Sequence, residues 1–196
     1  MNSTSSTRQT NITIWHLELF KAQHSSSEDN PQFRPSRSQP EDLKIEQAMI
    51  PSPELSRFLY TSVGGDWYWI DRLHWTYDRW MQYLDRPELE TWVASLKGTP
   101  AGYIELEVQP DNSVKIAYFG LLKAFIGKGI GGYLLSLGID RAWNLSATRI
   151  FVDTCSLDGE FALKNYQSRG FQIYKTETVV KELPIRAIGP WEGAYS

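Results

Sequence analysis

The sequence has little of several features that mark specialised classes of protein. Its 196 residues contain one cysteine, Cys155, which excludes an internal disulfide and favours a reducing compartment. No apolar run is long enough to span a bilayer, and the polar start MNSTSSTRQTN lacks the apolar core of a signal peptide. These absences predict a cytoplasmic protein that has no membrane partner.

An excess of positive charge is also absent. The chain has 20 Lys and Arg against 23 Asp and Glu, a formal net charge of −3. That balance argues against a nucleic-acid partner bound through a broad basic face. The length is sufficient for one domain with a real core. We expect that domain over residues 44–196, after an N-terminal extension over residues 1–43.

The most informative stretch lies at residues 114–143. Residues 114–119 alternate as a half-buried strand does, a short loop follows, and residues 127–132 read GKGIGG. Apolar residues at helical spacing come next, so the glycines stand where a helix begins. The first turn of a helix has unpaired N–H groups and the positive end of the dipole, and glycines let a ligand approach the backbone. The pattern predicts an anion site, most often for phosphate.

Two familiar phosphate motifs fit this stretch poorly. Gly127, Gly129 and Gly132 match the dinucleotide pattern G-x-G-x-x-G, but a loop separates them from the strand and too little chain follows for the usual repeated units. A nicotinamide-linked oxidoreductase is therefore disfavoured. A Walker A loop is excluded because Gly129, and not Ser or Thr, follows Lys128. A glycine-rich turn without a ligand is the remaining alternative.

The rest of the chain reads as a mixed α/β domain. Alternation and turn signals predict strands at residues 12–20, 43–49, 90–96, 102–108, 149–154 and 171–178. Capping signals predict helices that start after Ser52 and after Thr76, and a last helix covers residues 160–169. Hairpins make the first part of the sheet antiparallel, whereas the strand at 149–154 should run parallel to 114–119. We expect the strand at 12–20 to join one edge, and residues 21–41 to be a flexible link.

Residues 121–131, LLKAFIGKGIG, resemble the acyl-CoA-binding motif of the GCN5-related N-acetyltransferases (GNATs). The motif reads Arg or Gln, two residues, Gly, one residue, then Gly or Ala. Gly129 and Gly131 match its last two positions, whereas Ile126 stands at the Arg or Gln position and Lys123 where proline is common. The departures remove a side chain that helps to hold the pyrophosphate and leave the backbone cradle intact.

A second motif supports the resemblance. Residues 159–171, GEFALKNYQSRGF, are similar to the family's later helix, with Ala162, Tyr166, Gly170 and Phe171 in register. Gly159 replaces an asparagine that is frequent there. The resemblance covers about residue 44 to the C-terminus. It implies the GNAT fold, a central mixed antiparallel and parallel sheet with splayed middle strands, flanked by helices.

The resemblance implies an N-acetyltransferase that moves an acetyl group from acetyl-CoA to a primary amine by direct attack. The acceptor is a small-molecule or peptide amine, no metal is required, and the chain is a monomer or homodimer. The N–H of Leu121 is the expected partner of the thioester oxygen. The implied cofactor-binding residues are Phe119, Gly120, Leu121, Ile126, Gly127, Lys128, Gly129, Ile130, Gly131 and Gly132.

Acyl transfer needs an acid for the leaving thiolate and a base for the amine. Tyr166 matches the family tyrosine whose hydroxyl reaches the sulfur; otherwise it packs in the core. Glu105 and Glu107 share one strand face and are the candidates for the base, directly or through a water, unless that face is merely solvated. Asp153 and Cys155, at the end of a central strand, are expected to border the site.

The segment 66–75, DWYWIDRLHW, is the densest aromatic part of the chain. It either packs in the core or lines the acceptor pocket. Its Asp66 and Asp71, together with Glu105 and Glu107, predict a negative cleft that attracts an ammonium group. The acceptor-binding candidates are Trp67, Trp69, Asp71 and Trp75.

A second class of function stays open. A CoA-binding module that has lost catalysis, acting as a sensor or partner subunit, also fits the motifs. Ile126 and Gly159 depart from the family pattern and favour this alternative.

Overall fold

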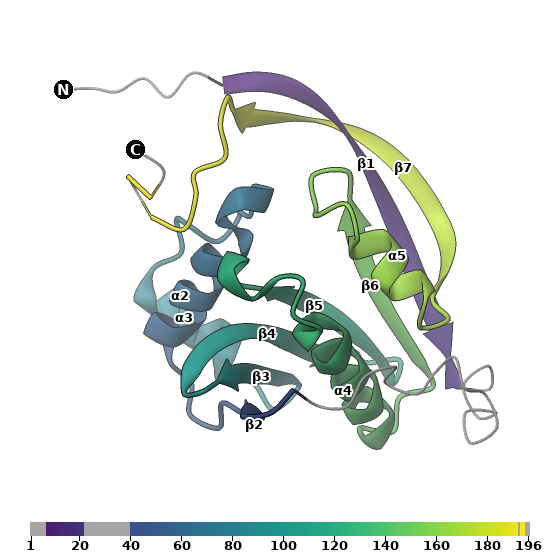
Figure 1. Ribbon diagram of the computed structural model, residues 1–196. Coiled ribbons are helices and arrows are strands. Elements are labelled where there is room, and N and C mark those ends of the chain that lie inside the picture. The colour runs from purple at the N-terminus through teal and green to yellow at the C-terminus, as the bar shows by residue number, and fades with distance from the viewer. Residues whose placement is uncertain (1–6, 22–39, 192, 195–196) are drawn as a thin grey trace.

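The computed structural model describes residues 7–21, 40–191 and 193–194. These residues form one seven-stranded sheet in the order β2-β3-β4-β5-β6-β1-β7 (Figure 1). The strands are β1 (Thr7–Phe20), β2 (Leu43–Gln47), β3 (Leu89–Leu96), β4 (Thr99–Val108), β5 (Ser113–Leu121), β6 (Arg149–Cys155) and β7 (Gln172–Pro184). The helices are α2 (Pro53–Gly64), η1 (Gly65–Trp67), α3 (Tyr77–Leu84), η2 (Lys123–Phe125), α4 (Ile130–Asn144) and α5 (Ala162–Gln167).

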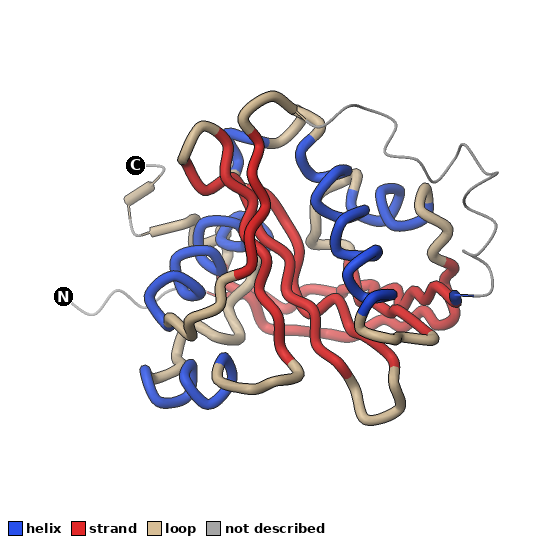
Figure 2. The backbone as a smooth tube through the Cα atoms, turned by 90° about the horizontal axis from the view of Figure 1, so that it is seen from below, coloured by secondary structure: helices blue, strands red, loops and turns tan. Residues whose placement is uncertain are grey.

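Helices cover both faces of the sheet, as the mixed α/β prediction requires. One layer holds α4 and α5 and the other holds α2 and α3 (Figure 2). The main core lies under α4, where Ile130, Leu134 and Leu135 pack against Ile104 and Leu106 of β4. None of the helices in the described ranges has the length and apolar character needed to cross a membrane.

The predicted order and directions of the four strands β3, β4, β5 and β6 are confirmed. The strands β3, β4 and β5 are antiparallel neighbours, and β5 runs parallel to β6. The first hairpin turn is short, and only Lys97 and Gly98 lie between β3 and β4. Both have positive φ, 51° and 81°, which is the backbone of a two-residue turn that follows the twist of the strands. Ser52 and Thr76 cap α2 and α3 as predicted.

The position predicted for the first strand is wrong. β1 does not lie at an edge; it lies between β6 and β7 and is antiparallel to both. The alternation of apolar residues reports which faces are buried and says nothing about neighbours along the sheet. Most of the link expected at residues 21–41 lies outside the described residues, and the domain boundary at residue 43 stays a prediction.

The centre of the sheet splits. Parallel pairing of β5 with β6 runs from Ser113 opposite Arg149 to Ile116 opposite Val152, and ends there. The next residue of β5, Ala117, is the extra residue of a bulge against β4, because Glu105 pairs with Tyr118 and Leu106 with Ile116. A bulge bends its strand. β5 therefore turns away from β6, and the two halves of the sheet diverge (Figure 1).

The outer half of the sheet extends beyond β6 as a two-stranded ribbon. β6 pairs with β1 only from Ile14 to Phe20, whereas β7 pairs with β1 as far as Thr7. We name residues 7–13 and 178–184 the β1–β7 arm. The chain then returns from β7 to η1, where the Gly189 N–H donates to the Gly65 carbonyl at 3.1 Å. A Cβ on Gly65 would lie 2.1 Å from the Gly189 oxygen, so this approach requires glycine.

The packing of β1 against the core can be tested through Leu17, whose side chain is 0% exposed in the core under α4. Leu17→Ala should lower the free energy of unfolding by about 2–5 kcal/mol in urea titrations. Asn11→Ala, an exposed change on the same strand, is the control and should cost no more than about 0.5 kcal/mol. Equal, small losses for both would contradict the packing of β1 against the core.

Candidate active site

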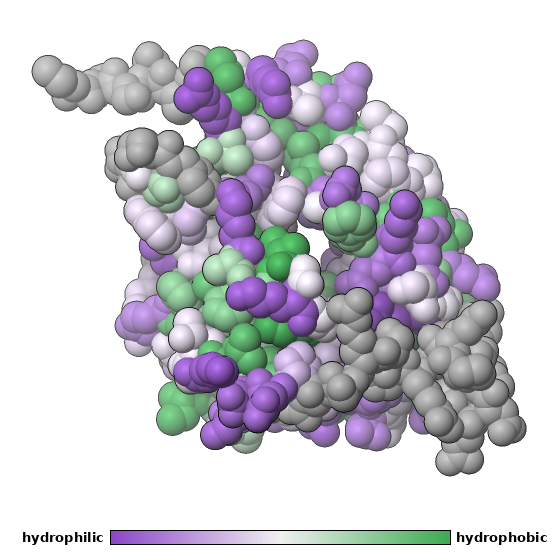
Figure 3. Space-filling view, viewed as in Figure 1, coloured by the Kyte–Doolittle hydropathy of each residue, from purple (hydrophilic) through white to green (hydrophobic). Residues whose placement is uncertain are grey.

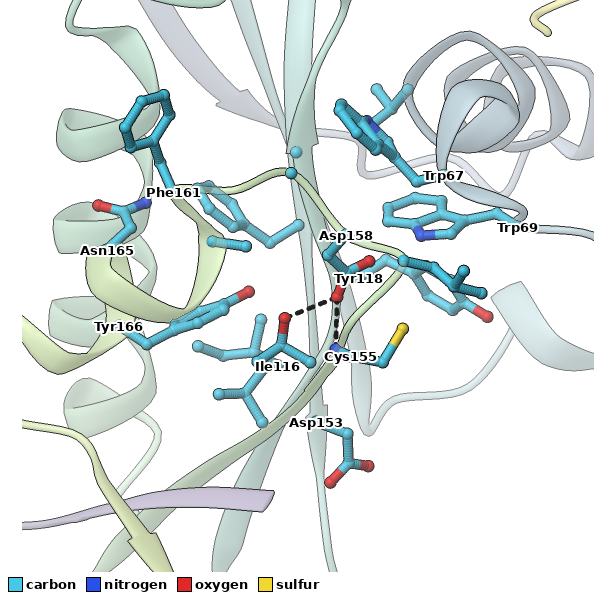
Figure 4. A pocket seen from close by; sticks show the side chains of 18 of the residues that line it. Trp67, Trp69, Ile116, Tyr118, Asp153, Cys155, Asp158, Phe161, Asn165 and Tyr166 are labelled. Carbon is cyan, nitrogen blue, oxygen red and sulfur yellow. Dashed lines mark hydrogen bonds between the residues drawn. The ribbon is translucent and has the colours of Figure 1, made fainter. Parts of the chain in front are cut away.

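A large cavity fills the gap between the diverging strands. Its volume is about 1260 Å³, and it is lined from both faces of the sheet. The space-filling view is hollowed between the two halves of the molecule (Figure 3). The close view shows Tyr166, Asn165 and Phe161 reaching it from the α5 side, and Trp67 and Trp69 from the opposite side (Figure 4). A single cavity therefore connects residues 127–132, which we name the glycine loop, to the aromatic segment 66–75.

The free edge of β5 forms one wall of the cavity. The Leu122 N–H donates to the Ala101 carbonyl, at 2.9 Å, on the β4 side. Because backbone groups alternate along an antiparallel strand, the N–H and C=O of Phe119 and Leu121 point to the other side, where β6 has diverged. Both residues line the cavity. This edge offers an extended ligand the hydrogen bonds that a neighbouring strand would make.

The glycine loop forms the end of the cavity. Gly127 and Gly129 both have φ of 82°, a conformation that side chains disfavour. Gly129 is the N-cap of α4 and supplies no side-chain cap, so the first N–H groups of the helix remain for a ligand. Of the ten predicted cofactor residues, those that line the cavity are Phe119, Gly120, Leu121, Ile126, Gly127, Gly129, Gly131 and Gly132.

The two remaining cofactor candidates lie outside the lining. The side chain of Ile130 is 0% exposed and belongs to the core. The Lys128 ammonium lies 5.2 Å from the centre of the Phe125 ring. A contact of Ile130 with a ligand would therefore come from its backbone.

Arg169, which the sequence did not single out, joins the two helices that border the glycine loop. Its Nη2 donates to the Gly132 carbonyl at 2.8 Å, its Nε to Ser136 at 3.2 Å, and its Nη1 to the Asn165 carbonyl at 2.9 Å. Burial lowers the pKa of this guanidinium. A Cβ on Gly132 would lie 2.8 Å from Nη2, so the glycine admits this contact. Arg169 thus fixes α5 against the first turn of α4.

Tyr166, the predicted acid, has its side chain in the cavity. It lies on α5, lines the cavity, and is 6% exposed, with its ring between Phe119 at 6.1 Å and Phe171 at 5.8 Å. Burial, with a smaller contribution from the charge of Asp158, raises the pKa of Tyr166 far above its usual range. The hydroxyl therefore keeps its proton at neutral pH and is present as a hydrogen-bond donor, and its role as the acid stays a prediction.

Asp158, also not predicted from the sequence, closes the end of β6. Its Oδ2 accepts from the Thr154 hydroxyl at 2.6 Å and from the Cys155 N–H at 2.8 Å (Figure 4). Asp153 and Cys155 both line the cavity, as expected. Burial raises the pKa of the Cys155 thiol, so the structure supplies no thiolate there.

The two predicted base candidates do not line the cavity. Glu105 is 1% exposed and accepts from Arg72 at 3.2 Å and from the Tyr83 hydroxyl at 2.9 Å. Burial raises the pKa of Glu105, and Arg72 and Tyr83 oppose the rise. Glu107 pairs with Arg86 at 2.8 Å. Their role as bases stays a prediction.

Arg72 is the centre of a buried aromatic cluster. Its guanidinium carbon lies 3.9 Å from the centre of the Tyr83 ring and 4.1 Å from that of Tyr118. The centre of the Trp75 ring lies 4.8 Å from the same carbon. The backbone N–H of Arg72 donates to the Tyr60 hydroxyl at 3.2 Å. Cation–π contacts of desolvated Arg are the strongest of their kind. These contacts hold the aromatic segment 66–75 against α3 and β5, on the side away from the cavity. Arg72 was not singled out from the sequence.

The acceptor-binding candidates divide into two groups. Trp67, Trp69 and Asp71 line the cavity, whereas Trp75 packs behind the wall against Arg72. Tyr118, which was not predicted, also lines the cavity, and its ring centre lies 4.8 Å from that of Trp69. We name Trp67, Trp69 and Tyr118, with Asp71 beside them, the aromatic wall.

The negative potential expected on this side is reduced by pairing. Glu105 and Glu107 face arginines, and Asp66 lies 3.5 Å from the Lys123 ammonium. Asp71 is exposed and, across the residues that the structure describes, has no ion pair. It is therefore the carboxylate of the aromatic wall that remains to meet a cation.

A chain of polar contacts starts on the other wall, where Lys115, Asp153 and His16 line the cavity, and continues beyond it to Glu177 and Lys175. Lys115 lies 3.0 Å from Asp153, Asp153 lies 2.6 Å from His16, His16 lies 3.1 Å from Glu177, and Glu177 lies 2.7 Å from Lys175. We name these residues the charge ladder. Burial would raise the pKa of Asp153, but Lys115 and His16 outweigh it and lower that pKa. The ladder connects β5, β6, β1 and β7 at the point where the sheet splits.

Comparison with protein families identifies the class. Residues 54–171 match the model of the acetyltransferase (GNAT) family, which is more than half of the chain. The chain therefore belongs to the GNAT family of acetyltransferases. No curated protein matches the sequence.

Solved structures support the fold. A GCN5-related N-acetyltransferase from Sphaerobacter thermophilus aligns with a TM-score of 0.63 at 16% identity, over 92% of this chain and 54% of that chain. One from Kribbella flavida gives 0.58 at 15%, over 90% and 60%. The chain thus spans less than two thirds of either protein. An aminoglycoside acetyltransferase from a soil metagenome, solved with trehalose, gives 0.54 at 16%, over 66% and 88%.

The structural role of Glu105 can be separated from a catalytic one. Glu105→Gln should lower the free energy of unfolding by about 3–5 kcal/mol, because it leaves Arg72 buried without its carboxylate. The double variant Arg72→Met with Glu105→Leu should lose much less free energy of unfolding than Arg72→Met alone and Glu105→Leu alone lose together. A fully stable Glu105→Gln protein with a large loss of kcat would instead support Glu105 as the base.

Proposed function

We propose that this protein is an N-acetyltransferase that uses acetyl-CoA to acetylate a primary amine by direct attack. The observation that carries the proposal is the cavity that passes through the split sheet. One end has the backbone edge of β5 and the first turn of α4, and the other has an aromatic wall with Asp71. Two ligands that enter from opposite faces would meet beside Tyr166.

The cofactor would bind through backbone groups. Extended pantetheine suits the outward N–H and C=O groups of Phe119 and Leu121. The pyrophosphate suits the glycine loop, residues 127–132, because the uncapped N-terminus of α4 and the positive end of its dipole lie there. Acetyl-CoA supplies the activated acyl group. Lys128 and Ile130 would take part there, Ile130 through its N–H group because its side chain does not line the cavity.

Two groups of this chain would act on the reacting atoms. The bond between the amine nitrogen and the acetyl carbon forms as the carbon–sulfur bond breaks. The Leu121 N–H would stabilise the negative charge on the carbonyl oxygen. The Tyr166 hydroxyl would give its proton to the departing sulfur.

The amine must lose a proton before or during attack. Asp71 lines the cavity without an ion pair among the described residues, so we assign the proton to Asp71, directly or through water. Glu105 and Glu107, the candidates from the sequence, would need a relay because arginines hold their carboxylates. Trp67, Trp69 and Tyr118 would hold the carbon body of the acceptor.

A CoA-binding module without catalysis is the second candidate. The observation that favours this candidate concerns Ile126. Its side chain is 49% exposed at the motif position where Arg or Gln would contact the pyrophosphate. Release of free CoA with any amine excludes the module. Tight binding without turnover across an amine panel favours it.

Tyr166→Phe tests the acid. We expect the calorimetric affinity for acetyl-CoA to stay within about twofold, because the ring still packs between Phe119 and Phe171. The kcat for CoA release should fall roughly 10²–10⁴-fold if the hydroxyl is a general acid. Wild-type turnover would return Tyr166 to a packing role.

Gly129→Asp tests the cofactor site. A carboxylate at this position would repel the pyrophosphate, so calorimetric binding of acetyl-CoA should disappear. Gly98→Asp is a matched control, because Gly98 has a similar φ of 81° in a turn with open space around it. Unchanged affinity in a folded Gly129→Asp protein would reject the glycine loop as the cofactor site.

A further inference from the structure

We propose that the acceptor is a small amine joined to an aromatic ring, and that Tyr68 is the residue that selects the ring. This substrate class rests on the proposed function, since it concerns the acceptor side of the same cavity. Three consecutive aromatic side chains, Trp67, Tyr68 and Trp69, all line that cavity. The backbone of Tyr68 makes the arrangement unusual.

Tyr68 has a backbone conformation that favours a much smaller residue. Its φ of 59° and ψ of 34° lie in the left-handed region directly after η1. The N–H of Trp69 donates to the carbonyl of Gly64 at 3.1 Å. Helix ends of this geometry usually have glycine or asparagine at the left-handed position. Large residues with such a backbone are uncommon, and they cluster at functional sites.

The turn at Tyr68 brings neighbouring side chains to one cavity. Successive side chains of an extended chain point to opposite sides, so a straight segment would present only every second ring. Here all three rings of residues 67–69 line the same space. Figure 4 shows Trp67 and Trp69 together on one side of it.

Trp67 and Trp69 are held in place by the protein itself. A Cβ on Gly64 would lie 2.1 Å from the Trp69 ring, so this ring lies directly on the end of α2. Its centre is 4.8 Å from that of Tyr118. The Trp67 ring reaches the loop after β6, because a Cβ on Gly159 would lie 3.5 Å from it. These two rings therefore meet a ligand in a fixed orientation.

The ring of Tyr68 remains for the ligand. Its side chain is partly buried, and within the described part of the chain it has no hydrogen bond and no aromatic partner. The other tyrosines of the cavity are engaged: Tyr60 accepts from the Arg72 N–H, Tyr118 packs against Trp69, and Tyr166 lies against Phe119. Tyr68 thus offers both a ring face and a hydroxyl to an acceptor.

Aliphatic side chains of the outer strands face the same space. Leu17 and Leu19 of β1 pack in the core under α4, so Ile12 and Ile14, on the other face of the strand, point to the side of the sheet that holds α2 and α3. Ile12, Ile14 and, from β7, Leu183 line the cavity. A flat apolar body would therefore lie between aromatic and aliphatic side chains.

Contacts across the split limit the size of the acceptor. Trp67 meets Gly159 from the opposite half of the molecule. The chain after β7 returns to η1, where the Gly189 N–H donates to the Gly65 carbonyl at 3.1 Å. The pairing of β5 with β6 joins the halves a third time. A small amine fits between these crossing points, whereas a folded polypeptide cannot lie along the gap.

An aromatic ring gains more from these walls than an aliphatic ring of similar size. Aromatic pairs in offset or edge-to-face contact gain about twofold to tenfold in binding beyond the burial of apolar area. A polyamine or an amino sugar would place hydrated polar groups against the rings and the aliphatic side chains, which is unfavourable without hydrogen-bond partners.

The test compares 2-phenylethylamine with 2-cyclohexylethylamine, which share one linker and have rings of six carbons. Wild-type kcat/KM should favour the phenyl compound by about twofold to tenfold. Tyr68→Leu should remove most of this preference without changing the calorimetric affinity for acetyl-CoA, and Tyr68→Phe should retain it. Comparing the preference across variants cancels the different basicity of the two amines.

Tyr68→Asn separates selection from folding. Asparagine tolerates the left-handed backbone, so the midpoint of urea unfolding should be unchanged or higher. The KM for 2-phenylethylamine should nevertheless rise by about twofold to tenfold as the ring is lost. Tyr77→Leu is the control, because Tyr77 is 59% exposed on α3 and does not line the cavity. It should alter neither the KM nor the preference.

Equal kcat/KM for the two amines in the wild type overturns the proposal, as does a preference that Tyr68→Leu leaves intact. A lower urea midpoint with an unchanged KM in Tyr68→Asn would make Tyr68 a packing residue and overturn it too. So would faster turnover of polyamines, amino sugars or peptides. If no amine releases CoA, the proposed function fails instead. Calorimetric binding of the two amines in the presence of CoA then decides the substrate class separately.

Discussion

The parallel pairing of β5 with β6 ends at Ile116 and Val152, and a bulge at Ala117 turns β5 away from its neighbour. That divergence frees one edge of β5 inside the molecule, where backbone groups would otherwise lack partners. It also opens the sheet so that one cavity reaches both of its faces. The glycine loop, Tyr166 and the aromatic wall gain a common space only because the strands part at this point.

Opening a sheet at its centre removes hydrogen bonds, so other contacts must hold the two halves in place. The charge ladder crosses β5, β6, β1 and β7 beside the split. On the aromatic side, Arg72 is enclosed by Tyr83, Tyr118 and Trp75 and neutralised by Glu105. A buried ion pair of this kind contributes to a defined arrangement more than to net stability. It fixes the wall against which we place the acceptor.

Local signals in the sequence were sufficient for much of this arrangement. The glycine run predicted the start of α4, the capping residues predicted α2 and α3, and a crossover helix predicted the parallel pairing of β6. Contacts between distant segments had no local signal. Alternation over residues 12–20 predicted the strand β1 without showing that β6 and β7 flank it. Glu105 looked like a free carboxylate because nothing in the sequence connects it to Arg72, 33 residues earlier.

The central claim is that the edge of β5 and the first turn of α4 bind acetyl-CoA. Amide hydrogen exchange with and without acetyl-CoA tests it most directly. We predict slower exchange at the N–H groups of Phe119 and Leu121 and in the glycine loop, residues 127–132, with little change in β2 and β3 at the far edge. Saturating acetyl-CoA that leaves exchange at Phe119 and Leu121 unaltered, or protects a different surface, would contradict the account.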